Sequence, residues 1–228
     1  MRLPSTPATT LWRGLRDEVR RSNRGGRVMI AVDGIDGAGK AAFADGLAAV
    51  FAEDGTAVFR ASMDDFHRPR AERYARGRSS PEGYYRDSFD YATFRRVLAD
   101  PFVEGWQTAA TTGFQLAAFD MRRDTPVESA WVTAPRDAVL IVDGVFLHRP
   151  ELRGLWHWSV WLDVPVDVAF RWMSERDGTD PDVLAPSNAR HRDGQELYLR
   201  DADPRRHASA IVDNTDAGDP RRVHQDFC

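Results

Sequence analysis

Three glycines and a lysine fall within seven residues near the N-terminus, in the segment Gly34-Ile-Asp-Gly-Ala-Gly-Lys40. The spacing fits the pattern G-x-x-x-x-G-K, in which glycines let the backbone wrap closely around a phosphate and present its N–H groups. Lys40 is the only lysine among 31 basic residues. Its compact ammonium can reach between β- and γ-phosphates, where the planar fork of arginine would not replace it. The pattern predicts a phosphate-binding segment, called here the glycine loop (residues 34–41).

The residues expected to touch a nucleotide come from this loop and from the start of the helix predicted after it. They are Gly34, Asp36, Gly37, Ala38, Gly39, Lys40, Ala41 and Ala42. The alternative is a glycine-rich turn at a helix start that binds nothing. A strand pattern before the loop and a helix pattern after it argue against that alternative, because the helix directs its positive end at the same place.

The residue after Lys40 departs from the pattern. Loops of this kind place Ser or Thr there, and the hydroxyl ligates Mg²⁺. Ala41 has no side-chain oxygen, and neither has Ala42. Mg²⁺ readily keeps water molecules as ligands, so a water can fill the place of the missing hydroxyl. We therefore expect phosphate binding to survive the change better than phosphoryl transfer.

Carboxylates follow two of the predicted strands. Asp64 and Asp65 come after the second strand, and Asp143 ends the run Val139–Asp143. Ligands of doubly wound sheets lie outside the carboxyl ends of the strands, so these groups should lie near the transferred phosphate. Asp64 could accept the proton of an attacking hydroxyl or hold Mg²⁺, and Asp143 could support the metal. For Asp65 a loop-capping role is an equally good explanation, and Asp143 could also simply start a turn.

Arginines flank the polar segment that follows the helix predicted at 166–174. Arg176, Arg190 and Arg192 could close over a phosphate and stabilise transition-state charge. A solvated charged surface is the alternative for each of them, and we favour Arg176. His67 on its own is expected to be structural or to stack. The other histidines, His224 among them, show no metal-ligand spacing.

The elements that must position these residues alternate between strand and helix patterns. Strands are predicted at 27–33, 56–61, 136–143, 158–163 and 211–213, with short ones near 114–119 and 130–132. Helices are predicted at 10–21, after the glycine loop, and at 91–99, 166–174 and 188–200. Residues 62–90 are predicted to form a long functional loop. The alternation predicts a parallel sheet with right-handed crossovers.

Composition limits the class of protein. The chain has 228 residues and a net charge of −4, which argues against a general nucleic-acid binder. The longest apolar runs are too short for a membrane span, and the N-terminal residues are too polar for a signal core. The single cysteine, Cys228, is compatible with a reducing cytoplasm. We expect an N-terminal tail and helix over 1–26, one domain over 27–216 and a C-terminal tail over 217–228.

Several further segments make the chain resemble the uridine kinase and phosphoribulokinase group of P-loop kinases, from about residue 27 to residue 216. Besides the glycine loop these are Ser62-Met-Asp-Asp-Phe-His67, Ser80-Pro-Glu-Gly-Tyr-Tyr85, Asp87-Ser-Phe-Asp90-Tyr91, Phe119-Asp120, Leu140-Ile-Val-Asp-Gly-Val-Phe146 and Arg176-Asp177. The resemblance implies a three-layer P-loop fold with a five-stranded parallel sheet and a helical lid at about 176–190. It also implies ATP with Mg²⁺ as cofactors, and a nucleoside or similar small molecule as acceptor.

The resemblance also implies roles for residues in the matching motifs. Asp64 matches the catalytic aspartate, with Lys40 and Arg176 as its partners in catalysis, and Asp64 and Asp143 would serve the metal. The acceptor would contact residues drawn from five motifs. They are Asp64, His67, Tyr85, Asp90, Asp120 and Arg176.

Two departures from the group keep alternatives open. Ala41 replaces the metal-binding hydroxyl, and Arg122-Arg-Asp-Thr125 lacks the histidine of true uridine kinases. The leading interpretation is an ATP-dependent small-molecule kinase. The alternatives are a nucleotide-binding pseudokinase with a regulatory or scaffold role, and a P-loop protein redirected to hydrolysis or to another acceptor. No nucleic-acid or membrane partner is expected, and the resemblance leaves a homo-oligomer open.

Overall fold

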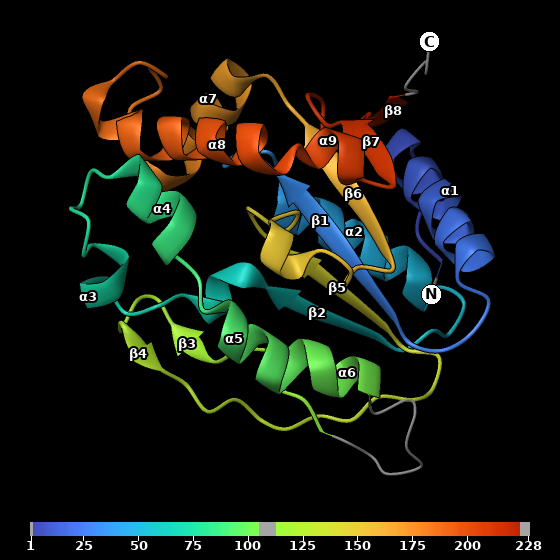
Figure 1. Ribbon diagram of the computed structural model, residues 1–228. Coiled ribbons are helices and arrows are strands. Elements are labelled where there is room, and N and C mark those ends of the chain that lie inside the picture. Colours follow the sequence, from blue (N-terminus) through green and yellow to red (C-terminus); the bar gives the residue numbers. More distant parts are fainter. Residues whose placement is uncertain (1, 105–112, 224–228) are drawn as a thin grey trace.

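A central sheet organises the molecule, which we describe from a computed structural model covering residues 2–104 and 113–223 (Figure 1). The strand order is β2-β5-β1-β6-β7-β8. The strands are β1 (Val28–Gly34), β2 (Val58–Ser62), β5 (Val139–Asp143), β6 (Trp158–Asp163), β7 (Ala210–Asp213) and β8 (Arg221–Val223). The first five of this order are parallel, and β8 pairs antiparallel with β7.

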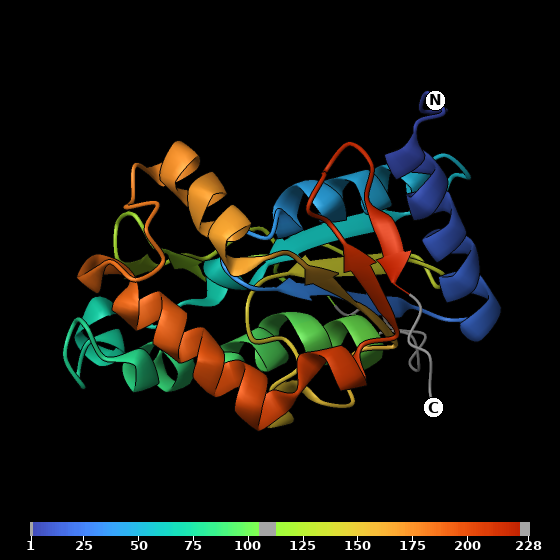
Figure 2. The same ribbon diagram turned by 90° about the horizontal axis from the view of Figure 1, so that it is seen from above.

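Helices cover both faces of this sheet. Figure 2 shows α1 and α2 on one side, and the run from α5 to α6 together with α8 on the other. The helices are α1 (Pro7–Ser22), α2 (Lys40–Ala52), α3 (Arg70–Arg73), α4 (Pro81–Asp87), α5 (Tyr91–Phe94), α6 (Asp100–Glu104), α7 (Val166–Asp177), α8 (Ala189–Ala202) and α9 (Pro204–His207). The parallel sheet predicted from the alternating patterns and the three-layer α/β architecture implied by the resemblance are both confirmed (Figure 2).

The buried strands explain why the central part was predictable. Every residue of β1 and of β5 is buried, which requires the continuous apolar runs seen in the sequence. The parallel register pairs Asp143 with Val32 on one side and with Ser62 on the other. The carboxyl ends of β2, β5 and β1 therefore meet at one edge of the sheet, and the residues that follow them gather there.

Three expectations about the elements were wrong. The sheet has a sixth strand, β8, whose sequence Arg221-Arg-Val contains no apolar run that would predict a strand. Residues 62–90 are not one loop, because a 3₁₀ turn (η1, Met63–Phe66), α3 and α4 lie within them. The strands expected near 114–119 and 130–132 reduce to a single bridge between Phe114 and Val132.

A small antiparallel arm lies between these last segments. It consists of β3 (Phe119–Asp120) and β4 (Thr125–Pro126). The helix expected at 91–99 is longer, because α5 continues through a π-helical turn at 95–99 into α6. No helix within residues 2–104 and 113–223 is long and apolar enough to cross a membrane. Residues 224–228, which include His224 and Cys228, lie outside the described part.

The N-terminal helix α1 packs against α2 at a point of very close approach. A Cβ at Gly46 of α2 would lie 2.3 Å from the ring of Trp12 in α1. A second link joins the helices, because Arg13 donates to both carboxylate oxygens of Glu53 at 2.7 and 2.9 Å. The N-terminal helix is thus built into one layer of the sandwich.

Candidate active site

The glycine loop leaves β1 and enters α2 through two residues in the left-handed region. Gly37 and Gly39 both have φ of +78°, which residues with a side chain rarely adopt. At Gly37 a Cβ would also lie 2.3 Å from the carbonyl oxygen of Ala169 in α7. Gly39 forms the N-cap of α2 without a side-chain hydrogen bond. The amides at this end of a 13-residue helix therefore stay open towards a ligand.

A cavity of about 380 Å³ lies against this loop and is called here the loop cavity. It brings together residues from β5, α2, α7, η1 and the loop itself. Its lining consists of Asp36, Gly37, Gly39, Lys40, Ala41, Ala42, Asp64, Asp143, Gly144, Val145, Trp172, Met173 and Arg176. Gly34 and Ala38 do not line it: Gly34 packs against Leu162, and Ala38 is fully buried.

Lys40 is held within the loop by one hydrogen bond. Its Nζ donates to the carbonyl oxygen of Ile35 at 2.7 Å, so the ammonium lies across the loop. Lys40 also lines the loop cavity, and its ammonium retains two further N–H donors that could bind a phosphate there. This is the chemistry expected from the sequence pattern.

Asp36 is tied to two helices. Its Oδ2 accepts hydrogen bonds from Tyr84 Oη at 2.7 Å, from Gln195 Nε2 at 2.8 Å and from His191 Nδ1 at 3.0 Å. Burial would raise the pKa of Asp36, but these hydrogen bonds and the nearby charge of Lys40 lower it overall. The carboxylate therefore anchors the loop to α4 and α8. Sequence reasoning missed these partners, because they lie 48 or more residues away.

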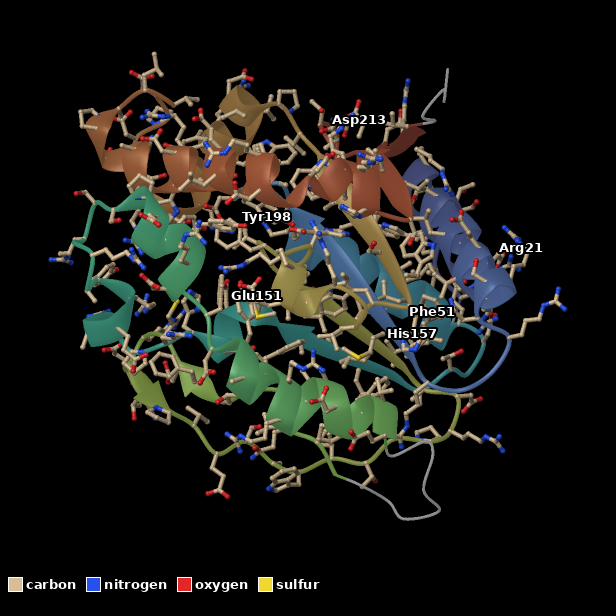
Figure 3. The ribbon with its side chains drawn as sticks, in the orientation of Figure 1. Arg21, Phe51, Glu151, His157, Tyr198 and Asp213 are labelled. Atoms are coloured by element: carbon tan, nitrogen blue, oxygen red, sulfur yellow. The ribbon has the colours of Figure 1, made fainter. Side chains whose placement is uncertain are left out.

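A second anchor lies beneath the loop. Asp33 is fully buried and accepts from Gly34 N at 2.8 Å and from His148 Nδ1 at 2.7 Å. Tyr198 reaches into the interior from α8 (Figure 3). Its hydroxyl also donates to Asp33. Asp33 thus fixes the start of the glycine loop, and Asp36 fixes its middle. No local signal in the sequence pointed to this arrangement.

The acidic residues after β2 differ in exposure. Asp64 is exposed and lines the loop cavity, whereas Asp65 is half-buried and does not. Burial, and then the charges of Asp64 and Asp143, raise the pKa of Asp65. The three carboxylates lie near one another because the register pairs Ser62, just before Asp64 and Asp65, with Asp143. Of the two carboxylates after β2, Asp64 is therefore the one that can contact a ligand in the loop cavity.

Asp143 is already paired. Arg60 of β2 donates to its Oδ1 at 2.8 Å, and the side chain of Asp143 is only 8% exposed. Burial raises the pKa of Asp143, against the opposing influence of Arg60 and Lys40. No motif of the sequence points to Arg60. Its only signal is that it stands two residues before the end of the strand next to β5.

The three arginines of the predicted lid segment have different surroundings. Arg176, near the end of α7, lines the loop cavity and pairs with Asp177 at 2.6 Å. Arg190 lies over the rings of Tyr74 and Tyr84 and donates to two backbone carbonyls. Arg192 donates to the Val183 carbonyl and pairs with Asp193. Only Arg176 of the three faces the cavity.

A second cavity, of about 610 Å³, adjoins the arm formed by β3 and β4 and is called here the arm cavity. Apolar and polar side chains both line it. They are Phe66, His67, Pro69, Glu72, Asp90, Thr93, Arg96, Val97, Gln115, Ala118, Phe119, Pro126, Val127 and Glu128. The linings of the two cavities are in contact at one point, because His67 Nδ1 lies 2.8 Å from the carbonyl oxygen of Asp64.

The residues expected to contact an acceptor are divided by the structure. His67 and Asp90 line the arm cavity, and Asp64 and Arg176 line the loop cavity. Tyr85 lines neither: it is buried, in contact with Phe146 and below the guanidinium of Arg149. Asp120 lines neither and accepts from the backbone amides of the turn at 122–123.

The donor set fits Mg²⁺ with one free carboxylate. Mg²⁺ in phosphate-transfer sites is held through one or two carboxylates together with phosphates and waters. Asp64 is exposed to the loop cavity and could serve, whereas Asp143 is engaged by Arg60 and Ala41 supplies no oxygen. Across the described ranges, no cluster of three or more His, Cys, Asp or Glu is arranged to hold a metal without a phosphate.

No protein-family model matches the sequence, and no curated protein is similar to it in sequence. Solved structures share its fold. One is a possible uridine kinase from Bacillus stearothermophilus, with a TM-score of 0.62 and 22% identity over 87% of this chain and 98% of that one. Another is a candidate fructose transport system kinase from a Silicibacter species, with a TM-score of 0.65 and 23% identity over 86% and 95%.

A third structure with this fold is a D-glycerate 3-kinase from Cryptococcus neoformans. Its TM-score is 0.53, with 11% identity over 87% of this chain and 89% of that one. These similarities confirm the fold class: the chain has the fold of P-loop kinases related to uridine kinase. At such low identity the similarity concerns the fold alone.

Proposed function

We propose that this chain is an ATP-dependent phosphotransferase that moves the γ-phosphate of ATP to a hydroxyl of a small molecule. The supporting observation is a contact between the linings of the two cavities. Asp64 lines one, His67 lines the other, and the two residues are joined by the 2.8 Å contact between His67 Nδ1 and the Asp64 carbonyl. A phosphate chain in the loop cavity and a hydroxyl compound in the arm cavity would meet at Asp64.

The chain's own residues divide the work as follows. The open amides of Gly37, Gly39 and Lys40 and the Lys40 ammonium hold the phosphate chain, and Arg176 faces it from α7. Asp64 accepts the proton of the acceptor hydroxyl as its oxygen attacks the γ-phosphorus and the bond to the β-phosphate oxygen breaks. Mg²⁺, held through Asp64, phosphates and waters, would neutralise charge on the phosphates when bound.

The arm cavity favours an uncharged acceptor. Its lining carries the carboxylates of Glu72, Asp90 and Glu128 against the single guanidinium of Arg96. Burial lowers the pKa of His67, so its ring is neutral at pH 7. A nucleoside or another polyol can use Asp90 and the apolar walls, whereas a sugar phosphate or a glycerate-like acid would meet repulsion. A small-molecule acceptor, no nucleic-acid or membrane partner, and a cytoplasmic location belong to the same proposal.

A second candidate function follows from Ala41 and from the pairing of Asp143 with Arg60. Both features weaken the usual metal site, which suits a nucleotide-binding protein that has lost turnover and acts as a regulator or scaffold. Such a protein would bind ATP in the loop cavity and leave it intact, whatever small molecule is supplied.

One experiment separates the two functions. ATP consumption and phosphorylated product are measured with nucleosides, neutral sugars, sugar phosphates and glycerate, for the parent and for Lys40→Ala. The proposal predicts turnover that depends on an uncharged acceptor and is lost in Lys40→Ala. ATP binding without turnover for any acceptor would favour the regulator. Turnover that persists in Lys40→Ala would contradict the site assignment.

A further inference from the structure

Arg60 occupies an unusual position for a cation, directly behind the Asp143 wall of the loop cavity. Its guanidinium donates to four partners: Asp143 Oδ1 at 2.8 Å, Asp45 Oδ1 at 3.0 Å, the Ile141 carbonyl at 3.0 Å and the Ala41 carbonyl at 3.4 Å. The side chain is 24% exposed. A fixed positive charge thus connects β2, β5 and the first turn of α2, which contains Ala41.

Arg60 reduces the negative charge that surrounds the loop cavity. ATP brings several negative charges beside Asp36, Asp64, Asp65 and Asp143, and Mg²⁺ usually offsets that repulsion. Here Arg60 already neutralises Asp143 through a charge-assisted hydrogen bond. Asp143 could join a metal directly only by giving up that bond, and Arg60 would then repel the metal.

On the basis of the proposed function, we propose that Arg60 is a positioning residue that partly replaces Mg²⁺ in ATP binding. ATP then binds almost as tightly without Mg²⁺ as with it. Ala41 is tolerated because Asp143 is bound by Arg60 and not by a metal ion that a hydroxyl at residue 41 would help to hold. Metal held through Asp64 is needed mainly for transfer of the phosphate and little for holding the nucleotide.

The test is the Kd of ATP, measured by calorimetry in excess Mg²⁺ and in EDTA. For the parent we expect the two values to agree within about threefold. For Arg60→Met the value in EDTA should weaken by about tenfold, because the charge of Asp143 then faces the phosphates uncompensated, while the value in Mg²⁺ changes little. A structural role alone would weaken both values alike.

Two further variants sharpen this measurement. Arg171→Met removes an exposed arginine of α7 that faces Asp167 at 3.6 Å, and should leave the ratio of the two Kd values unchanged. Arg60→Lys keeps the charge and should stay within about threefold of the parent ratio. It also replaces Arg60→Met if circular dichroism shows that the methionine variant does not fold.

The remaining variants test the link to Ala41. Ala41→Thr alone should change the ratio little, because Arg60 still holds Asp143. Ala41→Thr combined with Arg60→Met should give the strongest dependence on Mg²⁺.

Each contrary outcome has a distinct meaning. If the parent binds ATP only with Mg²⁺, or if Arg60→Met leaves the ratio unchanged, the role of Arg60 is overturned while the proposed function stands. If Arg60→Lys behaves as a neutral substitution would, with the EDTA value weakened by about tenfold, the charge argument is likewise wrong. If the parent binds no ATP in either condition, the proposed function fails and the role of Arg60 fails with it.

Discussion

Asp64 and Asp143 show how the surroundings of a residue decide its role. Both are carboxylates at the carboxyl ends of adjacent strands, and both line the loop cavity. Asp143 is nearly buried, has a pKa raised by that burial and is bound by Arg60. Asp64 is exposed to the cavity, so its carboxylate is free to meet a hydroxyl. At the residue scale, proton transfer therefore belongs to Asp64.

Asp64→Asn removes the proton acceptor and keeps the size of the side chain. We expect kcat to fall by about 100- to 10,000-fold, the range typical of a lost general base, while the Kd of ATP changes little. The measurement is steady-state turnover together with calorimetric ATP binding. Asp65→Asn is the matched control, because Asp65 does not line the cavity. An equal loss in both variants would contradict a proton-transfer role for Asp64.

The glycine loop could be predicted from sequence because its signal is local, with Gly37, Gly39 and Lys40 within four residues of one another. The residues that hold the glycine loop in place could not be predicted in this way. Arg60 reaches Asp143 across 83 residues, and His191 reaches Asp36 across 155 residues. Such contacts arise from strand register and from the packing of α8, and no local sequence pattern predicts them.

At the scale of elements, helix-forming tendency and packing conflict at the contact of α1 with α2. Glycine in a helix interior costs roughly 0.5–1 kcal/mol relative to alanine. Gly46 stands in the middle of α2, where a Cβ would lie 2.3 Å from the Trp12 ring. The close approach of α1 is therefore the reason for glycine at this position.

Gly46→Ala tests that conflict. We expect a loss of about 1–3 kcal/mol in the free energy of unfolding, because overpacking outweighs the better helix propensity. Urea unfolding measures it. Gly14→Ala in α1 is the control: nothing lies within 4 Å of a Cβ there, so the same substitution should stabilise slightly. Stabilisation by both substitutions would show that α1 does not pack on Gly46.

The hydrogen bonds between Glu53 and Arg13 of α1 predict that the stability of the folded chain depends on pH. Hydrogen bonds from Arg13 and from the Leu3 amide lower the pKa of Glu53 from 4.5 to about 2. A lowered pKa gives stability that is complete above pH 4.5 and is lost as the pH falls towards 2. The melting temperature of Glu53→Gln should therefore lie below that of the parent at neutral pH, and the gap should narrow on acidification. A gap that widens at acid pH would contradict the pairing.

The edge strand β8 shows why part of the fold escaped prediction at the element scale. Its sequence Arg221-Arg-Val carries charge where the buried strands carry apolar runs. Backbone pairing with β7 and the ion pair of Arg222 with Glu18 in α1 hold it in place. An edge strand needs no continuous apolar pattern, so hydrophobic periodicity could not reveal it.

On the scale of the whole molecule, the sheet gathers groups from distant segments at one edge. Residues from the turn after β1, the turn after β2, the end of β5 and α7 all line the loop cavity. A ligand bound there contacts α2 and α7 directly and is linked to α4 and α8 through Asp36. Binding should therefore stabilise the chain as a unit.

ATP should raise the melting temperature of the chain. At about a hundred times its Kd, ATP adds about 2.7 kcal/mol to stability, and in a chain of this size each kcal/mol shifts Tm by about 2–4 °C. We therefore expect a rise of roughly 5–10 °C by differential scanning fluorimetry. Lys40→Ala, which keeps the fold but loses the ammonium, should show little rise. An equal rise in both proteins would place ATP elsewhere.

The most direct test is a crystal structure of the chain with a non-hydrolysable ATP analogue. We expect the β- and γ-phosphates to lie against the amides of Gly37, Gly39 and Lys40 and the Lys40 ammonium, with the γ-phosphate facing Asp64. A glycine loop that holds no phosphate, with the nucleotide bound elsewhere or not at all, would contradict the account.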